Sequence, residues 1–164
     1  MSYIVGANTA ITITSAEYTQ GKAFGLGDRR TDSAGNTWVF CQASTSLAIY
    51  DAVRIKADYK CAQLTIDTGK QPVEVGFVQI AVADVTDYVW VMVTGRPLIR
   101  LAASCQPSVA LYATATGGVL DDATTSTMIQ GVVATTSVTA GATTAATCVA
   151  QFPTIQRSAN LTQI

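Results

Sequence analysis

Residues 84–121 read DVTDYVWVMVTGRPLIRLAASCQPSVALYATATGGVLD, and this stretch indicates the fold more clearly than any other part of the chain. A dense run of β-branched and aromatic residues, Tyr88–Val93, leads into the turn sequence Thr94-Gly95-Arg96-Pro97. A second run, Val109–Thr114, leads into Ala115-Thr116-Gly117-Gly118. Because such side chains favour strands and glycine and proline favour tight turns, the stretch predicts a small β-barrel or β-sandwich.

The rest of the chain repeats this pattern of short strands and turns. In Val53–Ala57, the charged residues Arg54 and Lys56 alternate with apolar ones, as in a strand with one buried face. The only stretch that permits a helix, Ala102–Cys105, is too short to matter. We predict one all-β domain over residues 1–164, a small β-sandwich or β-barrel that includes a jelly roll among its possible topologies. The predicted central strands are Thr37–Ala43, Ala52–Ala57, Ala62–Asp67, Val73–Ala83, Tyr88–Thr94, Leu98–Ala102 and Val109–Thr114.

A weak internal echo pairs two parts of this region. Residues 49–53, Ile-Tyr-Asp-Ala-Val, and residues 111–115, Leu-Tyr-Ala-Thr-Ala, both place an aliphatic residue before a tyrosine near a strand. The match is too short to establish a repeat from the sequence.

The chain carries unusually little charge for its hydrophobic content. Of its 164 residues, 49% are hydrophobic and 13% are charged, and the formal net charge is −1. A soluble monomer normally has about twice that share of charged residues. Two interpretations stay open: surface reserved for other subunits, or a compact surface solvated by its many Thr, Ser and Gln side chains.

The two ends of the chain hold almost none of the charge. Residues 1–16 and 123–156 contain no charged side chain, and in the C-terminal segment 123–164 only Arg157 is charged. These ends are either extended arms that contact another subunit by strand addition, or strands that complete the domain's own sheet. On the first interpretation, the candidate partner-binding residues are Ile11, Ile13, Met128, Val132, Phe152 and Ile155.

The composition argues against several other classes of protein. The ten basic residues are dispersed, whereas nucleic-acid binding needs a basic cluster. The start of the chain lacks a secretory signal, and no segment is long and apolar enough to span a membrane, so we expect synthesis in the cytoplasm. The four cysteines are widely spaced within apolar runs, which favours free buried thiols.

No constellation of residues points to catalysis, a cofactor or a metal. The chain has no histidine, which removes the usual nucleophile–histidine systems and most zinc sites. The carboxylate pairs Asp28/Asp32, Asp84/Asp87 and Asp121/Asp122 lie in turn-like segments, where aspartate ordinarily caps its own backbone. We therefore predict a protein that is not an enzyme, with no catalytic, cofactor-binding or metal-binding residues.

Several blocks between Ala23 and Asp122 resemble head decoration (cement) proteins of tailed double-stranded DNA bacteriophages. The similar blocks are Ala23–Asp28, Asp32–Phe40, Ile49–Ile55, Gly76–Ala81, Asp87–Gly95 and Ala110–Leu120. The resemblance rests on short words such as Tyr-Val-Trp-Val (88–91) and Leu-Tyr-Ala-Thr-Ala-Thr-Gly-Gly (111–118), and it carries over no catalytic residue.

This resemblance implies a structural virion protein on the outside of the capsid, made in the host cytoplasm. Its expected partners are the major capsid protein and further copies of itself, as a dimer or trimer, with neither nucleic acid nor membrane. Two alternatives stay open. One is a tail- or fibre-associated virion protein, and the other is a carbohydrate-binding β-sandwich that would expose aromatic side chains such as Trp38 or Trp90.

Overall fold

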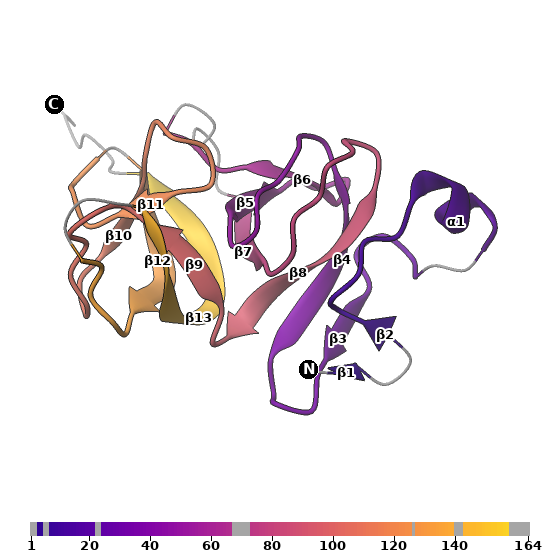
Figure 1. The fold of residues 1–164 in the computed structure, drawn as a ribbon, viewed down its shortest axis with the longest axis horizontal. Coiled ribbons are helices and arrows are strands. Elements are labelled where there is room, and N and C mark those ends of the chain that lie inside the picture. Colours follow the sequence, from indigo (N-terminus) through magenta and orange to yellow (C-terminus); the bar gives the residue numbers. More distant parts are fainter. Residues whose placement is uncertain are drawn as a thin grey trace, which may run out of the picture.

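The computed structural model describes residues 3–4, 7–21, 24–66, 73–125, 127–139 and 143–157, and it confirms the all-β prediction. Eleven strands form one continuous sheet, and two short N-terminal strands form a separate hairpin (Figure 1). The elements are β1 Tyr3–Ile4, β2 Ala7–Asn8, α1 Ser15–Thr19, β3 Arg29–Thr31, β4 Thr37–Ala43, β5 Ala52–Ile55, β6 Lys60–Gln63, β7 Glu74–Val78, β8 Tyr88–Gly95, β9 Leu98–Leu101, β10 Leu111–Ala113, β11 Leu120–Asp121, β12 Thr127–Ala134 and β13 Thr144–Arg157.

The first five long strands close into a ring, which we call barrel A. Around the ring the order is β4, β6, β5, β7 and β8, and β8 pairs again with β4. Strands β4 and β6 are parallel, and the other neighbours are antiparallel. Strand β3 continues the sheet beyond β4. Because the ring is closed, these strands leave little free edge for another chain to pair with.

The next five strands close into a second ring, barrel B, with the same connectivity. Its order is β9, β11, β10, β12 and β13, and β13 pairs again with β9. Strands β9 and β11 are parallel, as β4 and β6 are in barrel A. The chain is therefore a structural duplication of one five-stranded barrel, and Figure 1 shows the two barrels next to each other. The sequence echo does not mark equivalent positions, because Tyr50 precedes β5 whereas Tyr112 lies within β10.

Each barrel encloses an apolar interior that follows from the period-two alternation of its strands. In barrel A, every second residue of β4 and β8 points inward, and these residues are fully or almost fully buried. They are Val39, Cys41, Ala43, Val89, Val91 and Val93. Barrel B encloses a second cluster that also takes in Ala52, Leu64, Val75 and Phe77 from barrel A. The shared cluster holds the two barrels together.

The intervening residues of β4 and β8 form an aromatic layer on the outside of barrel A. It consists of Trp38, Phe40, Tyr88, Trp90 and Met92. Trp90 is therefore buried but lies outside the barrel interior, and Tyr112 of β10 is only half-buried.

The N-terminal segment covers this layer. Ile13 exchanges two backbone hydrogen bonds with Tyr88, of 2.9 and 2.8 Å. Tyr18 from α1 stacks on the Tyr88 ring with centroids 3.9 Å apart, and Phe24 meets the edge of Trp90 at 5.0 Å. From Ile13 onward, the N-terminal segment therefore packs on its own barrel and is not a free arm.

The sequence analysis missed α1 in this segment. Thr14 and Glu17 form a capping box, in which the Thr14 side chain accepts from the Glu17 N–H and the Glu17 carboxylate accepts from the Thr14 N–H. This Thr-x-x-Glu spacing is typical of a helix N-terminus and predicts α1 from the sequence. The helix has five residues, and only Tyr18 among them is half-buried.

The uncharged C-terminal end completes the domain's own sheet. Strand β13 pairs with β9 and β12 inside barrel B and then reaches barrel A, where Ala150 lies opposite Gly95 and Thr154 opposite Glu74. The alternative of an extended C-terminal arm is wrong for residues 127–134 and 144–157, because these residues are built into the sheet of barrel B. Strand β12 pairs with β13 along its length and with β10 at Met128 and Ile129, and β13 also pairs with β9, β8 and β7. Residues 158–164 lie outside the described part of the chain.

Four central strands differ from the predicted bounds by more than one residue. Strand β5 ends at Ile55 and not at Ala57, β10 spans Leu111–Ala113 and not Val109–Thr114, and β6 and β7 also differ. Strand β6 ends at Gln63, because the next residues turn to the neighbouring strands: the Leu64 N–H donates to Ala52 O and the Ile66 N–H to Thr114 O. Strand β7 ends at Val78, because the Gln79 side chain takes over both backbone hydrogen bonds of Leu98 in barrel B, at 3.0 and 3.2 Å. At the C-terminal ends of β6 and β7, contacts with barrel B therefore end the strand earlier than its local sequence predicts.

Candidate interaction surface

The outward sides of β12 and β13 form an uncharged face on barrel B. Val133 and Val149 lie directly opposite each other in the antiparallel pair, and they are 42% and 43% exposed. Phe152 is 52% exposed on the same strand pair. We call this surface the uncharged face, and its outward residues are Met128, Gln130, Val133, Thr147, Val149, Gln151, Phe152 and Thr154.

Phe152 is held in an unfavourable backbone conformation. The φ of Phe152 is +44°, in the left-handed helical region, which a residue with a bulky side chain rarely adopts. Pro153 follows directly, and a proline disfavours a helical conformation of the residue before it. Directly across the pair, the register of β12 shifts between Gln130 and Val132, at Gly131 with φ +79°. A Cβ at Gly131 would lie 2.6 Å from Gln151 O, so glycine is required there. This irregularity keeps a large apolar side chain pointing into solvent, and strain of this kind is concentrated at binding sites.

An open cleft of about 500 Å³ adjoins the uncharged face at the junction of the barrels. Arg96 is the only charged residue in its lining, and it has no ion pair with the described residues. The Thr94 hydroxyl is buried there without a hydrogen-bond partner. The lining comes from the β3–β4 turn (Ala34, Gly35, Asn36), the β8–β9 turn (Thr94, Gly95, Arg96) and β13 (Val149, Ala150, Gln151).

The structure separates the predicted partner-binding residues into three groups. Met128 and Phe152 lie on the uncharged face, half-buried and exposed respectively. Ile11 is exposed on the N-terminal segment, and Ile13 packs on the aromatic layer. Val132 and Ile155 are buried in barrel B, 3% and 4% exposed, and cannot contact a partner. For Val132 the error was one of strand parity, because its neighbour Val133 points outward.

Val133 and Val149 were the residues that the sequence analysis missed. Successive side chains of β12 and β13 point to opposite sides of the sheet, so each strand has two alternating sets of residues. Both sets are uncharged, so the composition does not show which set points outward. The bulge at Gly131 also shifts the parity between the two halves of β12. No signal in the sequence alone distinguishes the two sets.

Comparison of this chain with protein-family models, with curated proteins and with solved structures finds no match.

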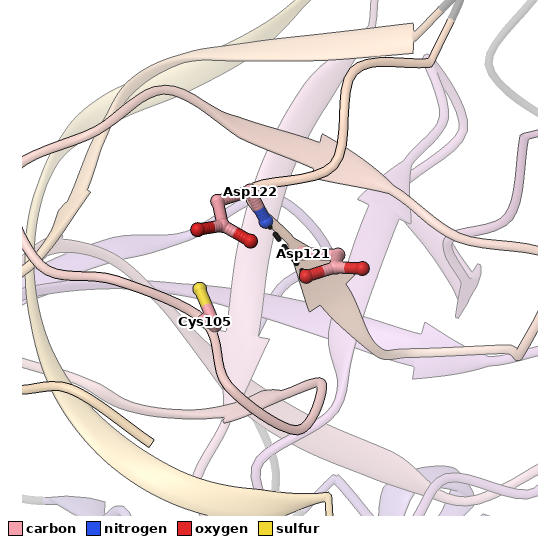
Figure 2. Close-up of side chains that lie close together, drawn as sticks. All are labelled: Cys105, Asp121 and Asp122. Carbon is pink, nitrogen blue, oxygen red and sulfur yellow. Dashed lines mark hydrogen bonds between the residues drawn. The ribbon is translucent and has the colours of Figure 1, made fainter. Parts of the chain in front are cut away.

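A cluster of Cys105, Asp121 and Asp122 is the one group in the described part of the chain with the geometry of a possible metal site (Figure 2). One ligand atom from each lies within 4.8 Å of the others. Asp121 Oδ1 accepts the Asp122 N–H at 2.9 Å, and Asp122 Oδ2 accepts the Gln106 N–H at 3.0 Å. The Asp121 carboxylate therefore closes its own turn, and the Asp122 carboxylate links that turn to the loop between β9 and β10.

The ionisation of this cluster also opposes metal binding. Burial, with the nearby charges of Asp122 and Asp121, raises the pKa of Cys105 to about 11. A thiol must lose its proton to become a metal ligand, so the raised pKa of Cys105 makes metal binding at this cluster less favourable. Burial also raises the pKa of Asp121, and its hydrogen bond with Asp122 raises it further. We assign the cluster a structural role.

The other candidate chemistry has ordinary structural partners. Asp32 accepts hydrogen bonds from the Ala34 and Asn36 N–H groups, and Asp28 accepts one from the Gly25 N–H, as predicted for capping aspartates. All four cysteines are buried free thiols, which confirms that prediction. Trp38 and Trp90 are 3% and 1% exposed, so neither provides the sugar-stacking surface that a carbohydrate-binding module was expected to show.

The described residues contain no helix long and apolar enough to cross a membrane.

Proposed function

We propose that the protein is a structural virion protein that binds the outside of an assembled bacteriophage capsid and stabilises it by bridging capsomers. The observation that carries this proposal is the uncharged face, with its opposed pair Val133 and Val149 and the strained, exposed Phe152. An exposed apolar patch with a rigid aromatic side chain is typical of a protein–protein contact. The resemblance of residues 23–122 to phage decoration proteins supports the identity of the partner.

The two closed barrels support docking by a preformed surface. Because β12 and β13 are built into the sheet of barrel B, we expect them to contact the shell through their outward sheet face and not by strand addition from a free C-terminal arm. A rigid surface loses little conformational entropy when it binds. Binding to the assembled shell, but not to free subunits, then stabilises the shell by mass action. Self-association as a dimer or trimer adds avidity across capsomers.

Co-sedimentation with empty phage shells tests the proposal. The wild-type protein should pellet with shells and raise the temperature at which they disrupt. Val149→Lys should weaken binding by about thirtyfold, the effect of losing a hot spot of about 2 kcal/mol. Val85→Lys is the matched control, since Val85 is 53% exposed on barrel A, away from this face. It should bind like the wild type.

The same experiment separates a head protein from a tail- or fibre-associated one. Shells and purified tails are incubated separately with the protein. Sedimentation with tails but not with shells would support the tail alternative and contradict the capsid proposal. If Val149→Lys bound as tightly as the wild type, the uncharged face would not be the contact surface.

A further inference from the structure

Residues of both barrels line the cleft beside the uncharged face, so the packing of the two barrels sets its shape. Asn36 from the β3–β4 turn accepts the Arg96 N–H through its side-chain oxygen at 3.3 Å, which ties this turn to the β8–β9 turn. Gly95 lies between them at φ +122°, and a Cβ there would lie 1.9 Å from Asn36 Oδ1. Strand β13 forms the third side through its pairing with Gly95 and Thr94. The volume, about 500 Å³, is within the usual range for ligand sites.

Among the described residues that line the cleft, Arg96 is the only charged one, and no ion pair neutralises its positive charge. Arg96 is exposed, and none of the described acidic residues forms an ion pair with it. The other arginine at the barrel junction, Arg100, is already paired with Asp51. A guanidinium matches a carboxylate in geometry and charge, and it can bind one through two hydrogen bonds.

The remaining wall of the cleft is apolar and continuous with the uncharged face. Val149 lines the cleft and is 43% exposed, and its cross-strand neighbour Val133 extends the apolar surface. Phe152 directly follows the lining residue Gln151. A ligand that fills the cleft therefore meets one positive charge and one aliphatic surface within a single site.

We propose that this cleft binds an extended segment of the partner protein that carries one Asp or Glu side chain next to an aliphatic residue. The carboxylate pairs with Arg96, and the aliphatic residue packs on Val149. This inference rests on the proposed function in taking the uncharged face as the docking surface, and it specifies the chemistry of the partner. An exposed ion pair of this kind contributes more to selectivity than to affinity.

Two blocked tripeptides, acetyl-Val-Asp-Val-amide and acetyl-Val-Asn-Val-amide, test this chemistry without a phage shell. Amide chemical shifts of the isotopically labelled protein are followed during titration with each peptide. The Asp peptide should shift Gly35, Gly95, Arg96 and Gln151, and it should bind about two- to fivefold more tightly than the Asn peptide at low salt. The difference should vanish at about 0.5 M salt, where exposed charges are screened.

The variant Arg96→Gln should abolish the preference for the Asp peptide. The matched control is Arg30→Gln, since Arg30 is an exposed arginine on β3 outside the cleft lining and should leave the preference unchanged. Equal affinity of the two peptides for the wild type, or shifts confined to other residues, would overturn the inference.

Shell binding by the same variants separates this inference from the proposed function. If the wild type does not pellet with shells but prefers the Asp peptide, the capsid proposal fails and the carboxylate site stands. If the wild type pellets with shells but shows no peptide preference, and Arg96→Gln pellets equally well, the carboxylate site fails and the capsid proposal stands. Weaker shell binding by Arg96→Gln together with the peptide preference supports both.

Discussion

Asp51 of barrel A binds Arg100 of barrel B across their junction, with 2.5 Å between Asp51 Oδ1 and Arg100 Nη1. The Asp51 side chain is completely buried, and its other oxygen accepts hydrogen bonds from the Ala48 N–H at 2.8 Å and from Gln63 Nε2 at 2.7 Å. Gly118 of barrel B packs so closely on Asp51 that a Cβ there would lie 2.3 Å from the carboxylate. Together with the shared apolar cluster, this satisfied charge fixes the arrangement of the barrels and hence of the cleft between them.

Replacing Arg100 by methionine should lower the free energy of unfolding by about 2–3 kcal/mol. The reason is that Asp51 would remain buried without its counter-charge, a change that costs about 3–5 kcal/mol in a fully buried pair. Arg100 retains 29% side-chain exposure, which reduces the effect. Urea unfolding measures it. Arg96→Met, the control at an unpaired exposed arginine, should change stability by about 0.5 kcal/mol or less. Equal effects of the two variants would contradict a structural role for the Asp51–Arg100 pair.

Replacing Phe152 by glycine should stabilise the free protein by about 1 kcal/mol while weakening binding through the uncharged face. Glycine adopts φ +44° without the penalty that a side chain incurs there, which is about 1–2 kcal/mol. The control is Gln151→Gly, at a neighbouring exposed residue with an ordinary extended backbone, which should destabilise by about 0.5–1 kcal/mol. Thermal unfolding checks the sign. A less stable Phe152→Gly would show that Phe152 is retained for folding.

The sequence predicted what depends on local preference and alternation. Strand β4 was predicted with its observed bounds, and β8 and β9 were placed within one residue at each end, because their β-branched and aromatic runs are bounded by glycine, proline or aspartate. Strand β6 was predicted over Ala62–Asp67 but spans Lys60–Gln63, so its start was predicted two residues late and its end four residues late. The contact of Ile66 with Thr114 of barrel B explains only the early end.

The duplication and the exposed side of β12 and β13 could not be predicted in the same way. Both barrels use the same strand order, but ring closure is a property of long-range pairing that leaves no repeated words in the sequence. Val132 and Val133 are identical residues next to each other, and only the bulge at Gly131 determines which one reaches solvent. The register of β12 and β13 therefore determines which residues form the interaction surface, and the sequence alone does not show this register.

Replacing Asp32 by asparagine should make stability less sensitive to acid. Burial alone would raise the pKa of Asp32, but hydrogen bonds from Asn36, Trp38 and the backbone lower it below the ordinary 3.8. An acid whose folded pKa is lowered stabilises the fold above its unfolded pKa and loses that contribution as pH falls through the folded value.

The wild type should therefore lose stability through this group as the pH falls below about 4, and Asp32→Asn should lose less over the same range. At pH 7 the variant should be about 1–3 kcal/mol less stable, because Trp38 Nε1 loses its acceptor. The control Asp84→Asn changes an exposed carboxylate and should follow the wild-type pH curve. An Asp32→Asn curve parallel to the wild type at all pH values would contradict the assignment.

The four buried thiols should not react with a thiol reagent such as Ellman's reagent in the folded protein at pH 8. Burial raises the pKa of Cys105 to about 11 and that of Cys148 to about 12, and contact with Cys61 and burial raise the pKa of Cys41, so the reactive thiolate is scarce as well as inaccessible. In denaturant all four should react. Val149→Cys provides the positive control, because a thiol at that exposed position should react at once in the folded state and should be blocked when a partner covers the uncharged face. Rapid reaction of any native thiol would show that a barrel opens, which would contradict the rigid docking surface on which both proposals depend.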